Sequence, residues 1–199
     1  DNTINYALIN NVKNHQKVFG GISVKNSNLK ISNSIIQNFS TIDAINVSVG
    51  NLEMRNTLMA FSNSDMIDSD FSSVKVDGNL FLGSNGDYID SNQSNILITN
   101  NYITNLKLGN YIFNSDKGIS CGEKSICYSD KNVFNGLNFG IAIKDSSYAK
   151  SSNNFFHDNV IAIGKFVKKP WYGTVKFENI NNKFTMNCKN NDNLGFYRY

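Results

Sequence analysis

The sequence reads Val74-Lys75-Val76-Asp77-Gly78 and then, 22 residues later, Ile96-Leu97-Ile98-Thr99-Asn100. Two earlier segments have the same form, an alternating strand that ends in an Asn corner, and they lie 22 and 45 residues before Val74: Leu52-Glu53-Met54-Arg55-Asn56 and Leu29-Lys30-Ile31-Ser32-Asn33. Looser copies follow at 127–132 and 149–154. A repeat this short, with alternating apolar residues, predicts a stack of β coils and no helical repeat.

A second series of strands has the same period and is marked by isoleucine. The isoleucines follow one another at steps of 23, 22, 22, 30, 22 and 22 residues, at Ile22, Ile45, Ile67, Ile89, Ile119, Ile141 and Ile163, with Ile161 as the other candidate for the last place. If each strand pairs with its counterpart in the next coil, these side chains form an inward ladder with a rise of about 4.8 Å per coil. The sequence therefore predicts an all-β, right-handed parallel β-helix of about 22-residue coils.

Polar residues also recur in register at the corners. The residues that follow the first strand of each coil are Ser34, Thr57, Asn79, Asn101, Asn132 and Asn154. Asn and Ser side chains can hydrogen-bond between stacked coils, so a structural ladder is the preferred interpretation of this series. The same interpretation applies to Asp43, Asp65 and Asp87, because Asp at a repeated turn binds backbone amides.

The period fails in two places. The 30-residue step between Ile89 and Ile119 predicts a loop of about eight residues within Leu106 to Asn114, and such insertions commonly project on a binding face. After Gly164 the pattern weakens into an aromatic segment, so we expect one domain over residues 1–199, with coils over about 16–165 and an aromatic C-terminal cap over about 166–199.

Two segments carry a resemblance to known proteins. Residues 116–125 (Asp116 to Ser125) and, one coil later, residues 140–147 (Gly140 to Ser147) resemble the β-helix repeats of the pectate-lyase-like superfamily, and the likeness extends over roughly residues 20–165. The resemblance implies a bacterial surface or polysaccharide-associated protein. The superfamily includes lyases, hydrolases, epimerases and adhesins, and none of the local motifs of its well-known enzymes is present, so the resemblance does not select a reaction.

Charged residues gather on the predicted outer face of the isoleucine strands. Alternation directs outward the residues one and three positions after each isoleucine, which are Asn46, Asp68, Asp90, Ser120, Ala142 and Ser48, Asp70, Asn92, Gly122, Lys144. Carboxylates spaced in this way suit glycoside hydrolysis or binding of Ca²⁺. Lys144 beside the aspartates suits a lyase, which needs a cation and a base. The candidate catalytic residues are therefore Asp68, Asp70, Asp90, Glu123 and Lys144.

Further residues are candidates for contact with a sugar. Lys117 and Asp145 lie near the same face, and aromatic rings can stack on sugars at Tyr88, Tyr102, Tyr111, Phe139, Trp171 and Tyr172. Of these, Tyr88 and Trp171 are predicted to be exposed and complete the candidate substrate-binding set. No metal-ligating set is predicted, because His15 and His157 stand alone.

Composition excludes some classes of partner. A net charge of +3 with Lys evenly interleaved among Asp and Glu argues against a nucleic-acid partner, and no apolar run reaches the roughly 20 residues of a membrane span. The chain starts at Asp1, which suggests a processed product or a piece of a longer protein. Cys121 and Cys127 could close a small disulfide loop or could stack as apolar thiols, and Cys188 leaves an odd number.

Two functions are compatible with these observations. The first is a carbohydrate-active or carbohydrate-binding β-helix, extracellular or at the cell surface, with a polysaccharide lying along the charged sheet; as an enzyme it would be a polysaccharide lyase or glycoside hydrolase. The second is a non-catalytic scaffold domain of a larger bacterial surface protein. A concave groove walled by the 30-residue coil would favour the first, and a flat exposed sheet the second.

Overall fold

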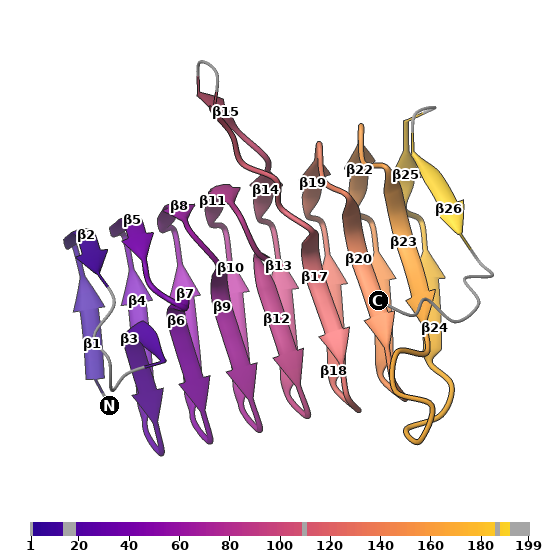
Figure 1. The fold of residues 1–199 in the computed structure, drawn as a ribbon, viewed down its shortest axis with the longest axis horizontal. Helices are drawn as coiled ribbons and strands as arrows, with labels where there is room; N and C mark the ends of the chain where they lie inside the picture. The colour runs from indigo at the N-terminus through magenta and orange to yellow at the C-terminus, as the bar shows by residue number, and fades with distance from the viewer. Residues whose placement is uncertain (1, 14–18, 109–110, 186–187, 192–199) are drawn as a thin grey trace.

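The computed structural model describes residues 2–13, 19–108, 111–185 and 188–191, and these form a parallel β-helix with three long faces (Figure 1). No helix occurs among these residues. Each coil contributes one strand to each of three parallel sheets, so strands that are neighbours in space come from successive coils. The predicted all-β solenoid of about 22-residue coils is confirmed.

The strand bounds follow the coil order. Sheet A contains, in spatial order, β1 (Asn2–Asn5), β4 (Asn28–Ser32), β7 (Asn51–Arg55), β10 (Ser73–Asp77), β13 (Asn95–Thr99), β18 (Ile126–Asp130), β21 (Tyr148–Ser152) and β24 (Lys176–Ile180). Sheet B contains β2 (Leu8–Lys13), β5 (Ile35–Ser40), β8 (Leu58–Ser62), β11 (Leu80–Ser84), β14 (Tyr102–Thr104), β19 (Val133–Asn135), β22 (Phe155–His157) and β25 (Lys183–Phe184). Sheet C contains β3 (Gly20–Lys25), β6 (Asp43–Ser48), β9 (Asp65–Asp70), β12 (Ile89–Asn92), β17 (Lys117–Gly122), β20 (Phe139–Lys144), β23 (Ile161–Phe166) and β26 (Lys189–Asn191).

The isoleucine ladder is the inner face of sheet C. Consecutive members are register partners from Ile22 to Ile163, and Ile163, rather than Ile161, pairs with Ile141. All members except the half-buried Ile22 are buried. Burial of each such side chain contributes roughly 1.5–3 kcal/mol, so the ladder is a main source of stability for this sheet.

Aromatic stacking replaces aliphatic packing toward the C-terminal end of sheet B. The rings of Phe134 and Phe156 stack at 5.0 Å between centroids, and those of Phe156 and Phe184 at 5.3 Å, each pair within 10° of parallel. Residues 176–185 and 188–191, which follow the expected coils, still form strands β24, β25 and β26 and pair with the coil before them. The coils therefore extend beyond the expected range of 16–165, at both ends, since β1 and β2 also pair with the second coil.

The predicted corner ladder is present. The Asn101 side-chain oxygen accepts a hydrogen bond from the backbone N–H of Asn79 at 2.8 Å. The backbone N–H of Asn101 in turn donates to the side-chain oxygen of Asn132 at 2.9 Å, and Asn132 donates to Asn154 in the same way. A second ladder, which the sequence reasoning missed, runs through Ser72, Ser94, Ser125 and Ser147 at the corner between sheets C and A. Both ladders satisfy backbone groups that the turns would otherwise leave buried and unpaired.

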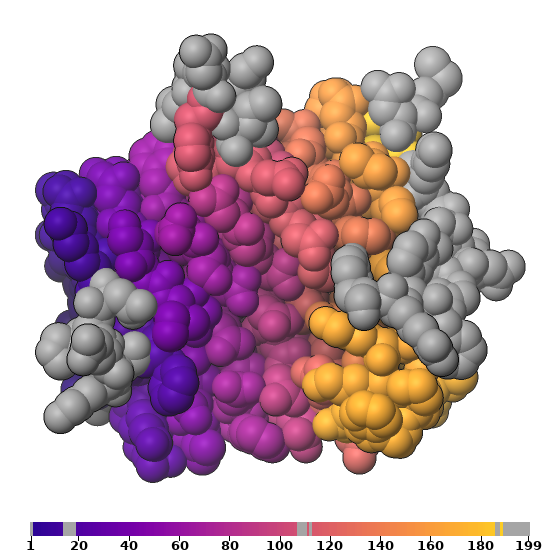
Figure 2. Space-filling model, viewed as in Figure 1, coloured from indigo at the N-terminus to yellow at the C-terminus, as the bar shows by residue number. Residues whose placement is uncertain are grey.

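The 30-residue coil inserts a small antiparallel hairpin. Its strands are β15 (Lys107–Leu108) and β16 (Tyr111–Ile112), and the amide of Phe113 closes its base by bonding to Leu106 O at 3.2 Å. Figure 1 shows the hairpin standing away from the body of the solenoid beside β14, and Figure 2 shows the coloured atoms of this segment projecting beyond the coils in the same view. The insertion thus lies within the predicted segment, and Ile89 and Ile119 on either side of it stay in register.

Candidate functional site

A hollow of about 500 Å³ lies on the outer face of sheet C, over strands β3, β6, β9 and β12. Its floor carries the predicted outward columns, and Phe19 and Ile42 form part of its wall. The lining residues are Phe19, Ser23, Lys25, Ile42, Asp43, Asn46, Ser48, Asp65, Asp68, Asp70 and Asp90. The aspartates of the charged columns thus lie in a concave surface, but the hairpin inserted in the 30-residue coil is not among its described walls.

The predicted columns are in register. Asn46, Asp68 and Asp90 are partners on successive strands, and so are Ser48, Asp70 and Asn92. Neighbouring strands put the backbones of Asp68 and Asp90 about 4.8 Å apart, while Asp68 and Asp70 are about 6.8 Å apart along β9. The structure therefore brings together three of the five predicted catalytic residues in this hollow.

Amide side chains hold two of these carboxylates. Asn46 donates from Nδ2 to Asp68 at 2.8 Å and to Asp43 at 3.3 Å, and Asn92 donates to Asp70 at 3.0 Å. These contacts fix the positions of the carboxylates on the sheet. Fixed acid and base groups are a requirement of catalysis, and they also occur in structural ladders.

Burial dominates the electrostatics of Asp68. Loss of water contact, followed by repulsion from Asp43, Asp70 and Asp90, raises the pKa of Asp68 to about 7. Its carboxyl therefore carries a proton over part of the neutral range. A protonated carboxyl beside other carboxylates is the arrangement that general-acid catalysis requires.

The acidic register at the start of these strands behaves in the same way. Burial, followed by repulsion from a neighbouring aspartate, raises the pKa of both Asp43 and Asp65 to about 7. Asp65 also accepts a hydrogen bond from the amide of Asp87 at 2.6 Å, as expected for a structural turn residue. Sequence reasoning missed that Asp43 and Asp65 share the hollow with Asp68; their common 22-residue step was the available signal.

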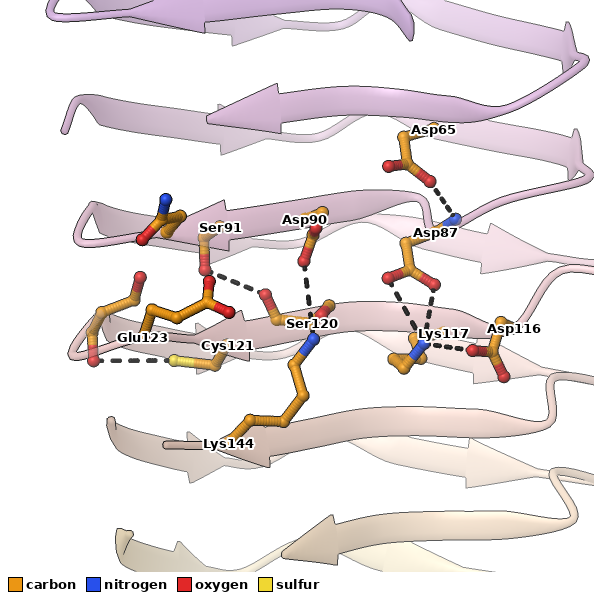
Figure 3. Close-up of polar contacts among 12 residues, drawn as sticks. Asp65, Asp87, Asp90, Ser91, Asp116, Lys117, Ser120, Cys121, Glu123 and Lys144 are labelled. Carbon is orange, nitrogen blue, oxygen red and sulfur yellow. Dashed lines mark hydrogen bonds and ion pairs between the residues drawn. The ribbon is translucent and has the colours of Figure 1, made fainter. Parts of the chain in front are cut away.

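Lysines partner the acidic groups at the next coils (Figure 3). Lys144 reaches across one coil to Asp90, with 3.8 Å between Nζ and Oδ1. Lys117 contacts Asp87 at 3.2 Å and also Asp116. Burial lowers the pKa of Lys117, but the two aspartates outweigh it and raise the pKa above its usual value. Burial raises the pKa of Asp87 to about 6, and the charge of Lys117 keeps it from rising further.

The remaining predicted residues lie under or on the segment that joins β23 to β24. Glu123, at the turn after β17, pairs with Lys169, and Asp145 is fully buried and accepts a hydrogen bond from the backbone amide of Lys169 at 2.7 Å. Glu123 is not among the residues that line the hollow. Trp171 is 79 % exposed, as predicted, but lies on this segment. Asp145 is therefore enclosed by protein where contact with a substrate was expected.

The expected exposure of Tyr88 is wrong. Its side chain is fully buried, and its hydroxyl donates to Thr104 O at 2.5 Å. The chain bends where it enters sheet C, so the residue before each ladder isoleucine also faces inward, as Ala44 and Met66 show. Strand alternation does not hold across this bend, which is why an argument from period two failed.

Cys121 and Cys127 form a disulfide that spans the turn between β17 and β18. This contact selects one of the two alternatives that the sequence left open. Cys188 is a free thiol. Within the described part of the chain, no group of three or more His, Cys, Asp or Glu side chains is arranged to hold a metal ion.

Comparison with protein-family models, with curated proteins and with solved structures finds no match to this chain. The described residues contain no helix long and apolar enough to cross a membrane. The likeness to the pectate-lyase-like superfamily therefore rests on the coil pattern and the parallel β-helix alone.

Proposed function

We propose that the protein acts on a polysaccharide bound along sheet C, and that the hollow is a glycoside-hydrolysing site. The observation that carries the proposal is the carboxyl of Asp68, which has a pKa of about 7 and stands in register with Asp90 on an open concave surface. Hydrolysis of a glycosidic bond needs a protonated carboxyl for the leaving oxygen and a second carboxylate for the sugar carbon or a water.

Asp68 is the proposed acid, because its proton is retained near neutral pH. The second carboxyl is that of Asp90 or Asp70, which flank Asp68 across the sheet and along the strand. Backbone spacings of about 4.8 and 6.8 Å are compatible with the carboxyl separations of roughly 5–5.5 Å in retaining and 6.5–9.5 Å in inverting enzymes. The retaining or inverting outcome therefore depends on which partner acts.

A hydrolase is favoured over a lyase by the charges in the hollow. A lyase must attract a uronate carboxylate with a cation, whereas five of the lining residues are aspartates and Lys25 is the one lysine among the described lining. Lys144, the expected cation, is already paired with Asp90. The hollow therefore suits a neutral or cationic glycan.

An extracellular or cell-surface location belongs to the same proposal. Polysaccharides of that kind surround cells, and a disulfide such as Cys121–Cys127 persists in oxidising compartments. Both considerations support an extracellular or cell-surface setting for the chain.

The experiment is product analysis by mass spectrometry after incubation with neutral, amino-sugar and uronate polysaccharides. We expect fragments of a neutral or amino-sugar polymer that have gained one water per bond cleaved. Asp68→Asn should lower the rate by about 10²–10⁴-fold, as loss of a general acid does. Asp130→Asn, on the opposite corner of the solenoid in β18, is the matched control and should cleave at the wild-type rate.

Two results would contradict the proposal. Unsaturated fragments without added water would indicate a lyase. Equal rates of cleavage by wild type and Asp68→Asn would show that Asp68 is not the general acid. Lys144→Ala tests the catalytic prediction for Lys144, and we expect slower turnover. Because the Lys144 side chain is 12 % exposed, the denaturation midpoint of this variant is measured alongside to confirm that the fold is retained.

A non-catalytic scaffold is the second candidate, and one observation favours it. Sheet B carries a continuous column of apolar residues on its outer face, in register from coil to coil: Leu8, Ile35, Leu58, Leu80, Tyr102, Val133 and Phe155. Five of these side chains are between 37 % and 65 % exposed. Contiguous exposed apolar surface is typical of a protein interface. For a scaffold, we expect that wild type releases no product from any polysaccharide and that Asp68→Asn behaves as wild type does.

A further inference from the structure

A second cavity, of about 630 Å³, lies where the strands of sheet B end and is separate from the acidic hollow. The inserted hairpin supplies one wall through Tyr111 and Phe113, and the ends of β5, β8 and β11 supply the floor. We refer to this cavity as the amide groove, because Asn38, Asn63 and Asn85 line it.

Three aromatic rings form a connected wall. The rings of Tyr111 and Phe113 lie 4.7 Å apart edge to face, and Phe61 lies 5.6 Å from Phe113. Tyr111 is 51 % exposed, while Phe113 beneath it is buried. The ring of Phe113 therefore packs against the coils, and the ring of Tyr111 presents its surface to the groove.

The wall is anchored to the coils at two points. Asn85 donates from Nδ2 to the Tyr111 hydroxyl at 2.7 Å, which fixes the outer ring. Gly83 lies directly under Phe113, since a Cβ there would come within 2.9 Å of ring atoms, and its φ of 63° is in the left-handed region that favours glycine. A side chain at position 83 would push the hairpin wall off the coil.

The floor presents amides at a regular spacing. Asn63 and Asn85 follow Ser62 and Ser84, which are register partners, so they occupy the same place on neighbouring coils about 4.8 Å apart. Their side chains approach to 3.5 Å, and Asn38 donates to Asn10 at 2.7 Å. Each carboxamide has two donor protons and an acceptor oxygen, more than these contacts use.

The charge of the groove differs from that of the hollow. None of its described lining residues is Asp or Glu, and Lys13 is the one charged side chain among them. Amides and hydroxyls bind uncharged polar groups, and an exposed tyrosine ring offers an apolar face with a polar tip. This is the chemistry that recognises sugar rings, which have hydroxyl edges and C–H faces.

We propose that the amide groove is a binding site for an uncharged oligosaccharide, with one sugar ring on Tyr111 and neighbouring hydroxyls on Asn63 and Asn85. The groove and the hollow lie on either side of the corner between sheets B and C, because Ser40 lines the first and Ile42, two residues on, lines the second. Binding in the groove does not require the hollow to be catalytic.

Calorimetric titration with hexasaccharides of glucose, xylose, mannose and galacturonate tests the proposal. We expect at least one of the three uncharged probes to bind wild type, and Tyr111→Ala to weaken that binding at least tenfold. Tyr102→Ala is the matched control, because Tyr102 is a similarly exposed tyrosine (42 %) on the outer face of sheet B and outside the groove. It should bind within twofold of wild type.

The same titration of Asp68→Asn separates this proposal from the hydrolase. Binding should persist in that variant even if cleavage is lost. The proposed binding site would be overturned if all three uncharged probes failed to bind, or if wild type and Tyr111→Ala bound them with equal affinity. Binding of galacturonate alone, abolished by Lys13→Gln, would overturn it in favour of an anion site. Circular dichroism and the denaturation midpoint of each variant confirm that the fold is retained.

Discussion

Asn101 shows how a single polar side chain stabilises three coils. Its Nδ2 donates to Val76 O at 3.1 Å and to Thr99 O at 2.8 Å, and its Oδ1 accepts from Asn79. Val76, Asn79 and Asn101 are buried and Thr99 is half-buried, so water cannot replace most of these bonds if they are lost. The corner therefore depends on this amide for more than turn formation.

Asn101→Leu should lower the free energy of unfolding by about 1–3 kcal/mol, because it strands buried backbone groups. Urea denaturation measures the change. Asn95→Leu is the matched control, since Asn95 is exposed on the outer face of β13 and should change stability by less than about 0.5 kcal/mol. Equal midpoints for Asn101→Leu and wild type would show that the ladder adds nothing.

The buried carboxyls make stability depend on pH with a definite sign. The pKa values of Asp43, Asp65 and Asp68 are about 7 and that of Asp87 is about 6, above the usual value near 3.9. The folded state therefore binds more protons than the unfolded state between about pH 4 and pH 7. Their contribution to stability is present below pH 4 and is lost as the pH rises through 7.

We expect the free energy of unfolding to fall between pH 5 and pH 8 by an amount on the order of 1–3 kcal/mol, since Asp43 and Asp68 keep some contact with water. Urea midpoints across this range measure it. Asp68→Asn, which has no charge to gain, should show a shallower fall. A midpoint that rises over the range in wild type would be incompatible with raised pKa values.

At the scale of the element, the ladder strands of sheet C are specified by one position in each coil. Ile119 is fully buried between Ile89 and Ile141, while Ile126, seven residues later in β18, is 38 % exposed. The same residue type thus occupies opposite faces of neighbouring strands. Alternation of the sequence is what separates them.

Ile119→Asp should cost more than about 4 kcal/mol, because it places an unpaired charge in the core. Ile126→Asp should cost less than about 1 kcal/mol. Chemical denaturation of the two variants gives the comparison. A similar loss in both would mean that the ladder has no special place in the stability of sheet C.

The element scale also shows what could be predicted. The repeat in the sequence predicted the strands of sheets A and C and their register, because an apolar residue recurs at the same position in each strand of these sheets. Sheet B was not identified from its own pattern, since β14, β19 and β22 contain only three residues each and a period cannot be read from so few. The insertion was placed within Leu106 to Asn114 from the step length, but its hairpin pairing was not predicted.

At the scale of the whole molecule, the solenoid converts sequence register into spatial proximity. Asp68 and Asp90 are 22 residues apart and become neighbours across the sheet. This part of the site could be predicted, because it depends on register alone. The burial of Tyr88 and Asp145, and the pairing of Glu123 with Lys169, depend on bends and on a returning segment, which register does not describe.

The molecule has two cavities that differ in the charge of their lining residues. The acidic hollow holds groups that can exchange protons, and the amide groove holds groups that can bind without charge. They lie on either side of one corner of the solenoid, between sheets B and C. Because both depend on coil stacking, loss of the ladder would disrupt both together.

The most direct test of the account is a carbon-13 NMR titration of the aspartate carboxyl groups, with Asp68→Asn used to assign the resonance of Asp68. We predict that the Asp68 carboxyl titrates with a pKa of about 7, with further carboxyls that titrate near 6 to 7 from Asp43, Asp65 and Asp87. Titration of Asp68 near 4, as in an ordinary exposed aspartate, would leave no proton for acid catalysis at neutral pH and would contradict the proposed function.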